Sequence, residues 1–155
     1  MSHWFDARAA KPAPLTPEQQ RKIALIKAAL QKSDKELHVL VHGISLAEDS
    51  AAHFGPQPSF GGHLFANITV KFRAQLAAEL RRASTRLAAL HTGLLAEKQL
   101  RSSLLASAAG ADAWYRALSS DDGATIFREQ KAMTAAFAKA DKLQKAGLAN
   151  LEKGR

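Results

Sequence analysis

Apolar residues recur every three or four positions through the first third of the chain. Nine positions alternate in steps of three and four, and eight of them are apolar: Ile23, Ile26, Leu30, Ser33, Leu37, Leu40, Ile44, Ala47 and Ala51. This spacing places the side chains on one face of an α-helix. Thr16, Pro17 and Gln19 form a helix-start signal just before the pattern. The sequence predicts one helix over residues 17–53; a second capping box at Ser33–Glu36 is the alternative, which would divide it.

A second long apolar pattern follows a segment rich in proline and glycine. Residues 54–64 carry two prolines, three glycines and no charge, which predicts a loop. The next pattern consists of Leu76, Leu80, Ala83, Leu87, Leu90 and Leu94. It predicts a helix over residues 66–109 that ends at Gly110, with a looser register where Glu97 and Arg101 take the next positions.

The last third of the chain predicts two further helical segments. Asp112 is a candidate cap for a short helix, which would carry Trp114, Tyr115 and Leu118. Residues 119–123 predict a turn, and residues 124–152 a final helix. No strand-like alternation appears. The predicted fold class is all-α: an elongated antiparallel three- to four-helix bundle built on a long helical hairpin, because helices of this length must lie side by side.

Composition supports one domain and excludes several chemistries. The 155 residues include 32 alanines and no cysteine. Disulfide frameworks, thiol catalysis and zinc fingers are therefore excluded for this chain alone. We expect an irregular N-terminal arm over residues 1–15 and one helical domain over residues 16–155. No apolar run is long enough for a membrane span or a secretory signal, so a cytoplasmic location is expected, with secretion routes that need no such signal left open.

The net charge of +8 is uneven along the chain. Residues 65–110 hold seven basic and two acidic residues, and residues 124–155 hold seven basic and three acidic residues. Basic side chains at helical spacing can contact phosphates, and the candidates are Lys71, Arg82, Arg86, Lys139, Lys142 and Lys145. An ordinary solvated helix face is the alternative reading of the same residues.

Aromatic residues in the two least regular segments are candidate anchors for a protein partner. The predicted tip loop and its flanks carry Phe54, Phe60 and Phe65, and the arm carries Trp4 and Phe5. Each ring can bury a large apolar area in a partner. The alternative is that the tip rings close the end of the bundle and the arm packs on its own chain.

Small residues along the predicted middle helix suggest a face for close helix contact. The candidate self-association positions are Ala78, Thr85, Ala89, Thr92 and Ala96. Small side chains let a second helix approach, although alanine is also the best helix former on a solvated surface.

The sequence gives little support for a catalytic or metal-binding site. His38, His42, Asp49 and His53 fall near one helix face, but one helix rarely supplies more than two ligands to one ion. Ser45, His42 and Asp49 on one exposed helix could not enclose a substrate. We therefore expect no enzyme activity, no metal and no cofactor. The leading hypothesis is a non-enzymatic interaction or adaptor protein that binds protein partners of unknown identity and self-associates; the alternative is a basic helical subunit associated with nucleic acid.

Overall fold

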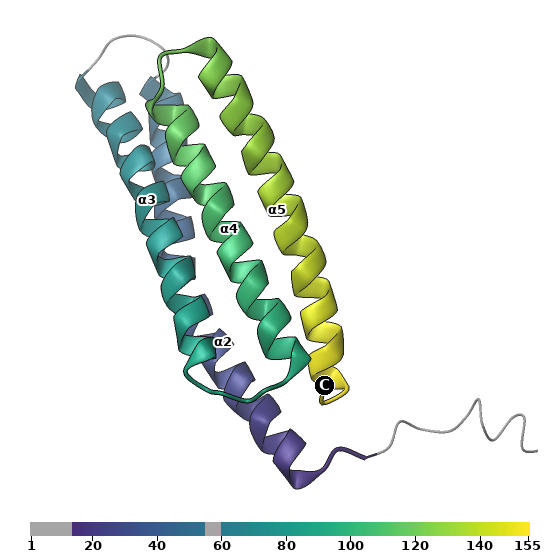
Figure 1. Ribbon diagram of the computed structural model, residues 1–155. Helices are drawn as coiled ribbons and strands as arrows, with labels where there is room; N and C mark the ends of the chain where they lie inside the picture. The colour runs from purple at the N-terminus through teal and green to yellow at the C-terminus, as the bar shows by residue number, and fades with distance from the viewer. Residues whose placement is uncertain (1–13, 55–59) are drawn as a thin grey trace, which may run out of the picture.

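The computed structural model describes residues 14–54 and 60–155, and this part of the chain is an all-α bundle of four helices (Figure 1). The helices are α2 (Pro17–Phe54), α3 (Phe60–Ala88), α4 (Leu95–Ser119) and α5 (Gly123–Glu152). Consecutive helices are antiparallel and form an elongated molecule, which confirms the predicted fold class. No helix in the described ranges meets the length and hydropathy needed to cross a bilayer.

Helix α2 begins at the predicted capping box. The Thr16 backbone N–H donates to Gln19 Oε1 at 2.8 Å, and the Gln19 N–H donates to Thr16 Oγ1 at 3.1 Å. The helix then continues past Ser33 without a break. The Ser33 side chain accepts a hydrogen bond from Arg86 Nη1 of α3 at 2.7 Å, so this hydroxyl joins two helices instead of starting one. The prediction of one helix over residues 17–53 is confirmed to within one residue.

The predicted helix over residues 66–109 is wrong, because the chain reverses between α3 and α4. His91 has a φ of 49° and Gly93 a φ of 72°, and these left-handed conformations end the helix. Two side chains then stabilise the turn: Glu97 accepts from the Thr92 N–H, and Thr92 Oγ1 accepts from the Leu94 N–H, both at 3.3 Å. Glu97 therefore interrupts the leucine pattern because its buried side chain accepts a hydrogen bond from the backbone of the connection.

Two neighbouring boundaries also differ from the predictions. α3 begins at Phe60, so the predicted loop over residues 54–64 is too long. Gly110 does not end a helix, and the predicted short helix after Asp112 is the C-terminal part of α4. Gly110 is buried below the Phe137 ring of α5, where an added Cβ would lie 2.6 Å from Phe137 Cε1. A packing requirement, and not a helix end, accounts for this glycine.

The last turn and helix agree with the sequence prediction. α5 starts at Gly123, one residue before the predicted position. Asp122 is its N-cap, and its carboxylate accepts from the Thr125 N–H at 3.2 Å and from Thr125 Oγ1 at 2.6 Å. These hydrogen bonds hold the pKa of Asp122 below its ordinary value.

Helices α4 and α5 approach closely because small residues line their contact. Gly147 of α5 faces Leu100 of α4, and an added Cβ would lie 2.8 Å from Leu100 Cγ. Ser103 Oγ of α4 donates to the Ala140 carbonyl of α5 at 2.7 Å. Ala140 itself is buried, at 5% exposure. Small side chains allow this backbone proximity, which is consistent with their density in the last third of the chain.

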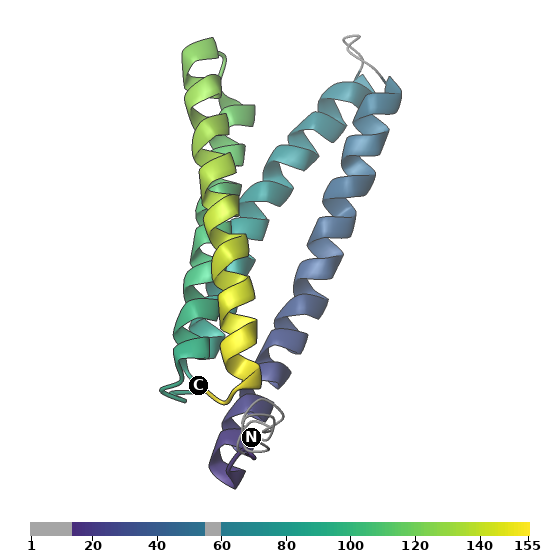
Figure 2. The ribbon, with the colours of Figure 1, turned by 90° about the vertical axis from the view of Figure 1, so that its right-hand side faces the viewer.

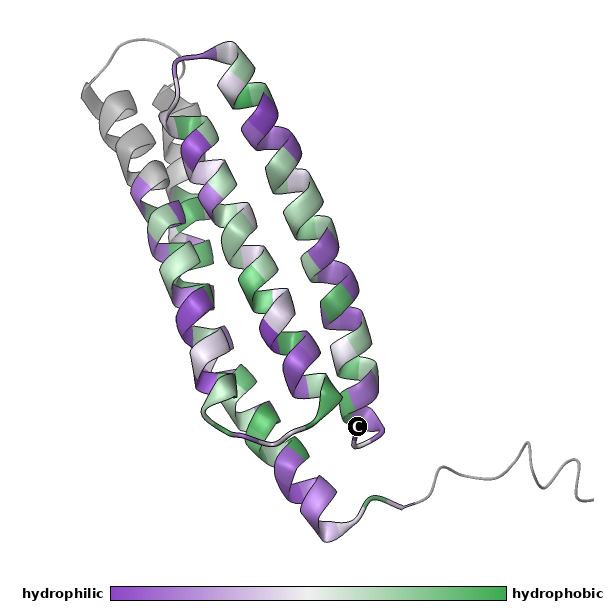
Figure 3. Cartoon of the chain, viewed as in Figure 1, coloured by the Kyte–Doolittle hydropathy of each residue, from purple (hydrophilic) through white to green (hydrophobic). Residues whose placement is uncertain are grey.

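Hydrogen bonds join three helix ends at the lower end of the bundle in Figure 1. Gly154 follows α5 with a φ of 69°, and its carbonyl accepts from Gln19 Nε2 of α2 at 3.3 Å. The Ala96 N–H at the start of α4 donates to the Arg155 carbonyl at 3.1 Å. A nearby apolar cluster unites all four helices: Ile23, Ile26, Ala29, Leu87, Ala96, Leu100 and Leu151. Figure 3 shows hydrophobic and hydrophilic positions interspersed along the described parts of the helices.

Candidate functional site

The bundle is open along one side, between α2 and α5. The closely packed pairs are α2 with α3, α3 with α4, and α4 with α5. The first and last helices therefore lie at the two edges of the arrangement. They meet at the end where Gln19 contacts Gly154, and Figure 2 shows them diverging from there toward the opposite end. A closed four-helix bundle would require α2 and α5 as a fourth closely packed pair, which they do not form in the described ranges.

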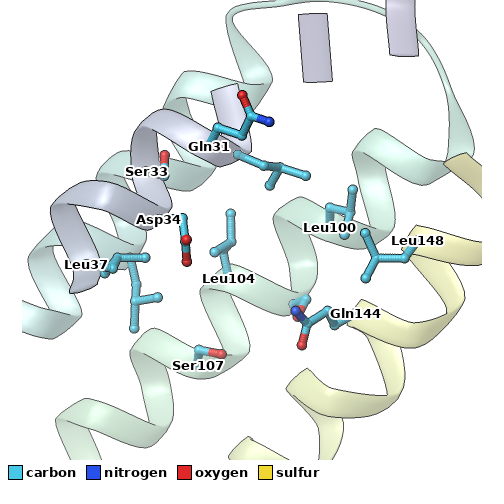
Figure 4. Close-up of a pocket in the computed structure, with 12 residues that line it drawn as sticks. Gln31, Ser33, Asp34, Leu37, Leu100, Leu104, Ser107, Gln144 and Leu148 are labelled. Carbon is cyan, nitrogen blue, oxygen red and sulfur yellow. The ribbon is translucent and has the colours of Figure 1, made fainter. Parts of the chain in front are cut away.

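A groove of about 430 Å³ lies where these two helices separate (Figure 4). Its floor comes from α3 and α4 and its two walls from α2 and α5. The residues that line it are Leu30, Gln31, Ser33, Asp34, Leu37, Leu80, Leu100, Ser103, Leu104, Ser107, Gln144 and Leu148. Six of these twelve are leucines, so the groove offers an apolar surface with a polar rim, which is the usual character of a binding site.

The leucines of the groove are incompletely covered by the chain itself. Leu148 on the α5 wall keeps 42% of its surface exposed. Leu30, Leu37 and Leu104 are each half-buried. In Figure 4, Leu104 projects from α4 into the space between the α2 and α5 walls. A partner that covered these side chains would gain about 25 cal/mol for each Å² of apolar surface removed from water.

One charged residue, Asp34, lines the groove. The two buried serines already have partners, since Ser33 accepts from Arg86 and Ser103 donates to the Ala140 carbonyl. Within the described ranges, by contrast, the Asp34 carboxylate forms no ion pair or hydrogen bond. Figure 4 shows it pointing into the groove beside Leu37 and Leu104. The groove therefore combines an apolar floor with one carboxylate that can accept from a cationic ligand group.

The residues that line the groove bring together no set of catalytic groups. Asp34 has no second titratable group beside it in the lining. Nor do the described residues contain a group of three or more potential metal ligands. The predicted candidates His38 and His42 are exposed, with stacked rings whose centroids are 6.4 Å apart. The expectation that the chain is not an enzyme stays a prediction.

The predicted aromatic anchors fall where side chains are not described. Trp4 and Phe5 lie outside the described residues, as does the rest of the segment up to residue 13. Phe54 ends α2 and Phe60 begins α3, so Phe60 belongs to a helix and not to the predicted loop. Phe65 lies in the first part of α3, and the side chains of all three lie outside the described part. Their proposed role as anchors stays a prediction.

The predicted small-residue face does not form one stripe. Ala78 and Thr85 are exposed on α3, and Ala89 is exposed in the following turn. Thr92 and Ala96 are buried, at 3% and 0% exposure, beyond the break between α3 and α4. The error follows directly from treating residues 66–109 as one helix. Thr92 and Ala96 are thus covered within the chain, and the self-association role of the exposed Ala78, Thr85 and Ala89 stays a prediction.

Several predicted phosphate ligands form ion pairs within the chain. Arg82 pairs with Glu79 on α3, and Lys145 pairs with Asp141 on α5 at 2.9 Å. Arg86 pairs with Glu36 of α2 at 3.2 Å as well as with Ser33. The other three candidates remain exposed: Lys71, Lys139 and Lys142. The six side chains are thus divided between α3 and α5, which are not a closely packed pair.

Sequence reasoning missed two features of the structure. Arg73 appears in the sequence as one more basic residue, yet it is 2% exposed and its Cζ lies 3.6 Å from the centre of the Trp114 ring of α4. Burial lowers the pKa of this guanidinium from its ordinary value. The groove was missed because a groove depends on how helices diverge. The polar Ser33 within the apolar pattern of α2 was the available signal, since it lies in the lining of the groove.

Comparison of the chain with protein-family models, curated proteins and solved structures finds no match.

Proposed function

We propose that this chain is a non-enzymatic interaction protein that binds a helix of a partner protein in the groove between α2 and α5. The observation that carries the proposal is the open side of the bundle, where leucines from all four helices, four of them incompletely buried, surround one carboxylate. Antiparallel helices bury their apolar faces against neighbours on both sides in a closed bundle. Here α2 and α5 each lack one neighbour at the level of the groove.

A helix suits this groove better than an extended strand or a small molecule. The two walls are helices, so an inserted helix can pack its side chains between theirs. An extended strand would find no exposed sheet edge in the described part of the chain, which is helical. An amphipathic helix would present leucine-like side chains to the floor and solvated residues outward, the mode known as helix-in-groove recognition.

Nucleic-acid association is the second candidate function. The net charge of +8 favours it, because basic side chains displace counterions from phosphates. The arrangement of the candidates supports it less well, since Arg82, Arg86 and Lys145 already pair with acidic residues. Self-association and binding through Phe54, Phe60 and Phe65 likewise remain proposals that side-chain contacts do not yet support.

Two leucines of similar exposure allow a matched test of the groove. Leu148 lines the groove and is 42% exposed, whereas Leu118 is 46% exposed at the C-terminal end of α4 and does not line it. Both changes to glutamine should preserve the fold, because neither leucine is buried. We expect Leu148→Gln to lose a protein that co-purifies with the tagged chain from its native source, and Leu118→Gln to retain it. Quantitative affinity purification measures the difference.

Treatment with nuclease in a parallel sample separates the two candidate functions. A protein bound in the groove should remain after nuclease digestion and at raised salt. Two results together would reject the groove and favour nucleic acid: loss of all binding partners in the digested sample, and equal partner recovery by Leu148→Gln and Leu118→Gln in the undigested sample.

A further inference from the structure

We propose that residues Trp4–Arg8 of the N-terminal arm dock in the α2/α5 groove of their own chain and occupy it when no partner is bound. The inference rests on the proposed function in one respect, because both use the same groove. It assigns an occupant that the chain itself supplies. Three observations carry it: where the arm joins the bundle, how far it extends, and which side chains it contains.

The arm joins the bundle at its lower end, between the two helices that form the walls of the groove. Leu15, the last residue of the arm, packs against the apolar cluster at the lower end. It also lies next to Gly154, where its Cδ2 would be 2.8 Å from an added Cβ. The arm therefore departs between the start of α2 and the end of α5, the two helices that form the walls of the groove.

The arm is long enough to bring its aromatic residues to the groove. Leu30 and Leu37 stand about 20 and 30 Å along α2 from Pro17, at 1.5 Å per residue. Trp4 precedes Pro14 by ten residues, which span about 31 Å in the extended form that prolines favour. Trp4 can thus reach the level of Leu37, and Phe5, about 28 Å from Pro14, can reach a level between Leu30 and Leu37.

The side chains of the arm complement those of the groove. Trp4 and Phe5 are adjacent aromatic residues, and each can cover a large area of the exposed leucine surface. Arg8 follows them by three residues and supplies a guanidinium for the Asp34 carboxylate, which has no ion-pair partner within the described ranges. A partner helix with an apolar stripe and one basic residue would use the same two features and would have to displace the arm.

Fluorescence of Trp4 tests the inference in the full chain. The sequence contains two tryptophans, so Trp114→Phe leaves Trp4 as the single reporter. We expect its emission to be shifted to shorter wavelength and its quenching by acrylamide to be reduced relative to a peptide of residues 1–13. The added change Leu104→Gln or Asp34→Arg should abolish this protection, and Leu118→Gln should leave it unchanged.

A charge reversal makes the test specific. In the chain with Asp34→Arg, the second change Arg8→Asp should restore protection of Trp4, because the ion pair is re-formed with opposite sense. Circular dichroism of each variant establishes that the helices persist. Protection that no groove change removes would overturn the inference, and so would a Trp4 as exposed as that of the peptide.

Concentration separates docking within one chain from exchange between copies. Protection within one chain should be independent of protein concentration, and protection that grows with concentration would overturn the inference in favour of a second copy. The outcome is distinguishable from failure of the proposed function. If Trp4 is exposed while Leu148→Gln still loses its partner, the arm inference fails and the partner groove stands; if Trp4 is protected but neither leucine variant changes partner recovery, the reverse holds.

Discussion

Replacing Gly147 by valine is expected to lower the free energy of unfolding by about 2–3 kcal/mol, because α4 and α5 could no longer approach as they do. A Cβ at this position would lie 2.8 Å from Leu100 Cγ and 3.3 Å from the Leu100 backbone nitrogen. The second distance matters most, since a backbone atom cannot rotate away as a side chain can. Urea unfolding followed by circular dichroism measures the loss.

Gly123 provides the control for this change. It stands at the start of α5, and an added Cβ there would find no atom within 4 Å. Gly123→Ala should therefore raise stability by about 0.4–1 kcal/mol, through a less flexible unfolded chain. Combining Gly147→Val with Leu100→Ala should cost less than the sum of the two single changes, because the smaller residue makes room. Equal effects at Gly147 and Gly123 would contradict the close packing of α4 and α5.

Replacing Trp114 by alanine is expected to cost about 2–4 kcal/mol, from lost packing and from exposure of a buried cation to a void. The Trp114 ring covers the Arg73 guanidinium at 3.6 Å and thereby joins α3 to α4. Arg73 itself is 2% exposed, so removal of the ring would leave charge beside a cavity. Thermal or urea unfolding measures the effect.

Phenylalanine at the same position distinguishes the stacking from simple burial. Trp114→Phe keeps an aromatic face beside Arg73 and should lose less than half of what Trp114→Ala loses. Leucine fills space without an aromatic face and should fall between the two. If leucine and phenylalanine are equivalent, the ring contributes volume alone and the cation–π interpretation is wrong.

The elements with complete local signals could be predicted from the sequence. Thr16 and Gln19 form the predicted capping box, and the Asp122 cap starts α5 where the preceding turn residues indicate. Steps of three and four residues also predicted that α2 is continuous. These features depend on residues close together in the chain, so a local pattern is sufficient to find them.

The break between α3 and α4 could not be predicted from the same pattern. Leu87, Leu90 and Leu94 keep helical spacing because all of them reach the same apolar cluster, Leu87 from the end of α3 and the other two from the connection before α4. The signals against a helix were His91 and Gly93, and a single glycine is a weak one. Gly110 led to the opposite error: it predicted a helix end, although its small size allows close contact with Phe137.

The candidate site was beyond prediction for a related reason. Leu30 and Leu37 read as core residues, and in the lower bundle the same stripe of α2 does reach the core at Ile26. Whether the upper part of the stripe is covered depends on the distance from α5, which no local pattern encodes. Asp34 likewise reads as a solvated residue beside Ser33 until the structure places it at the groove.

The open side of the bundle is the central claim, and the distance between α2 and α5 at two levels tests it most directly. The chain has no cysteine, so spin labels attach only at introduced cysteines. One pair, Arg21→Cys with Glu152→Cys, reports the lower end, and a second, Val41→Cys with Thr134→Cys, reports the level above the groove; all four positions are exposed. Double electron–electron resonance should give a clearly longer distance for the upper pair. Equal distances at the two levels would mean that α2 and α5 keep a constant separation, as in a closed bundle, and leave no groove for a partner or for the arm.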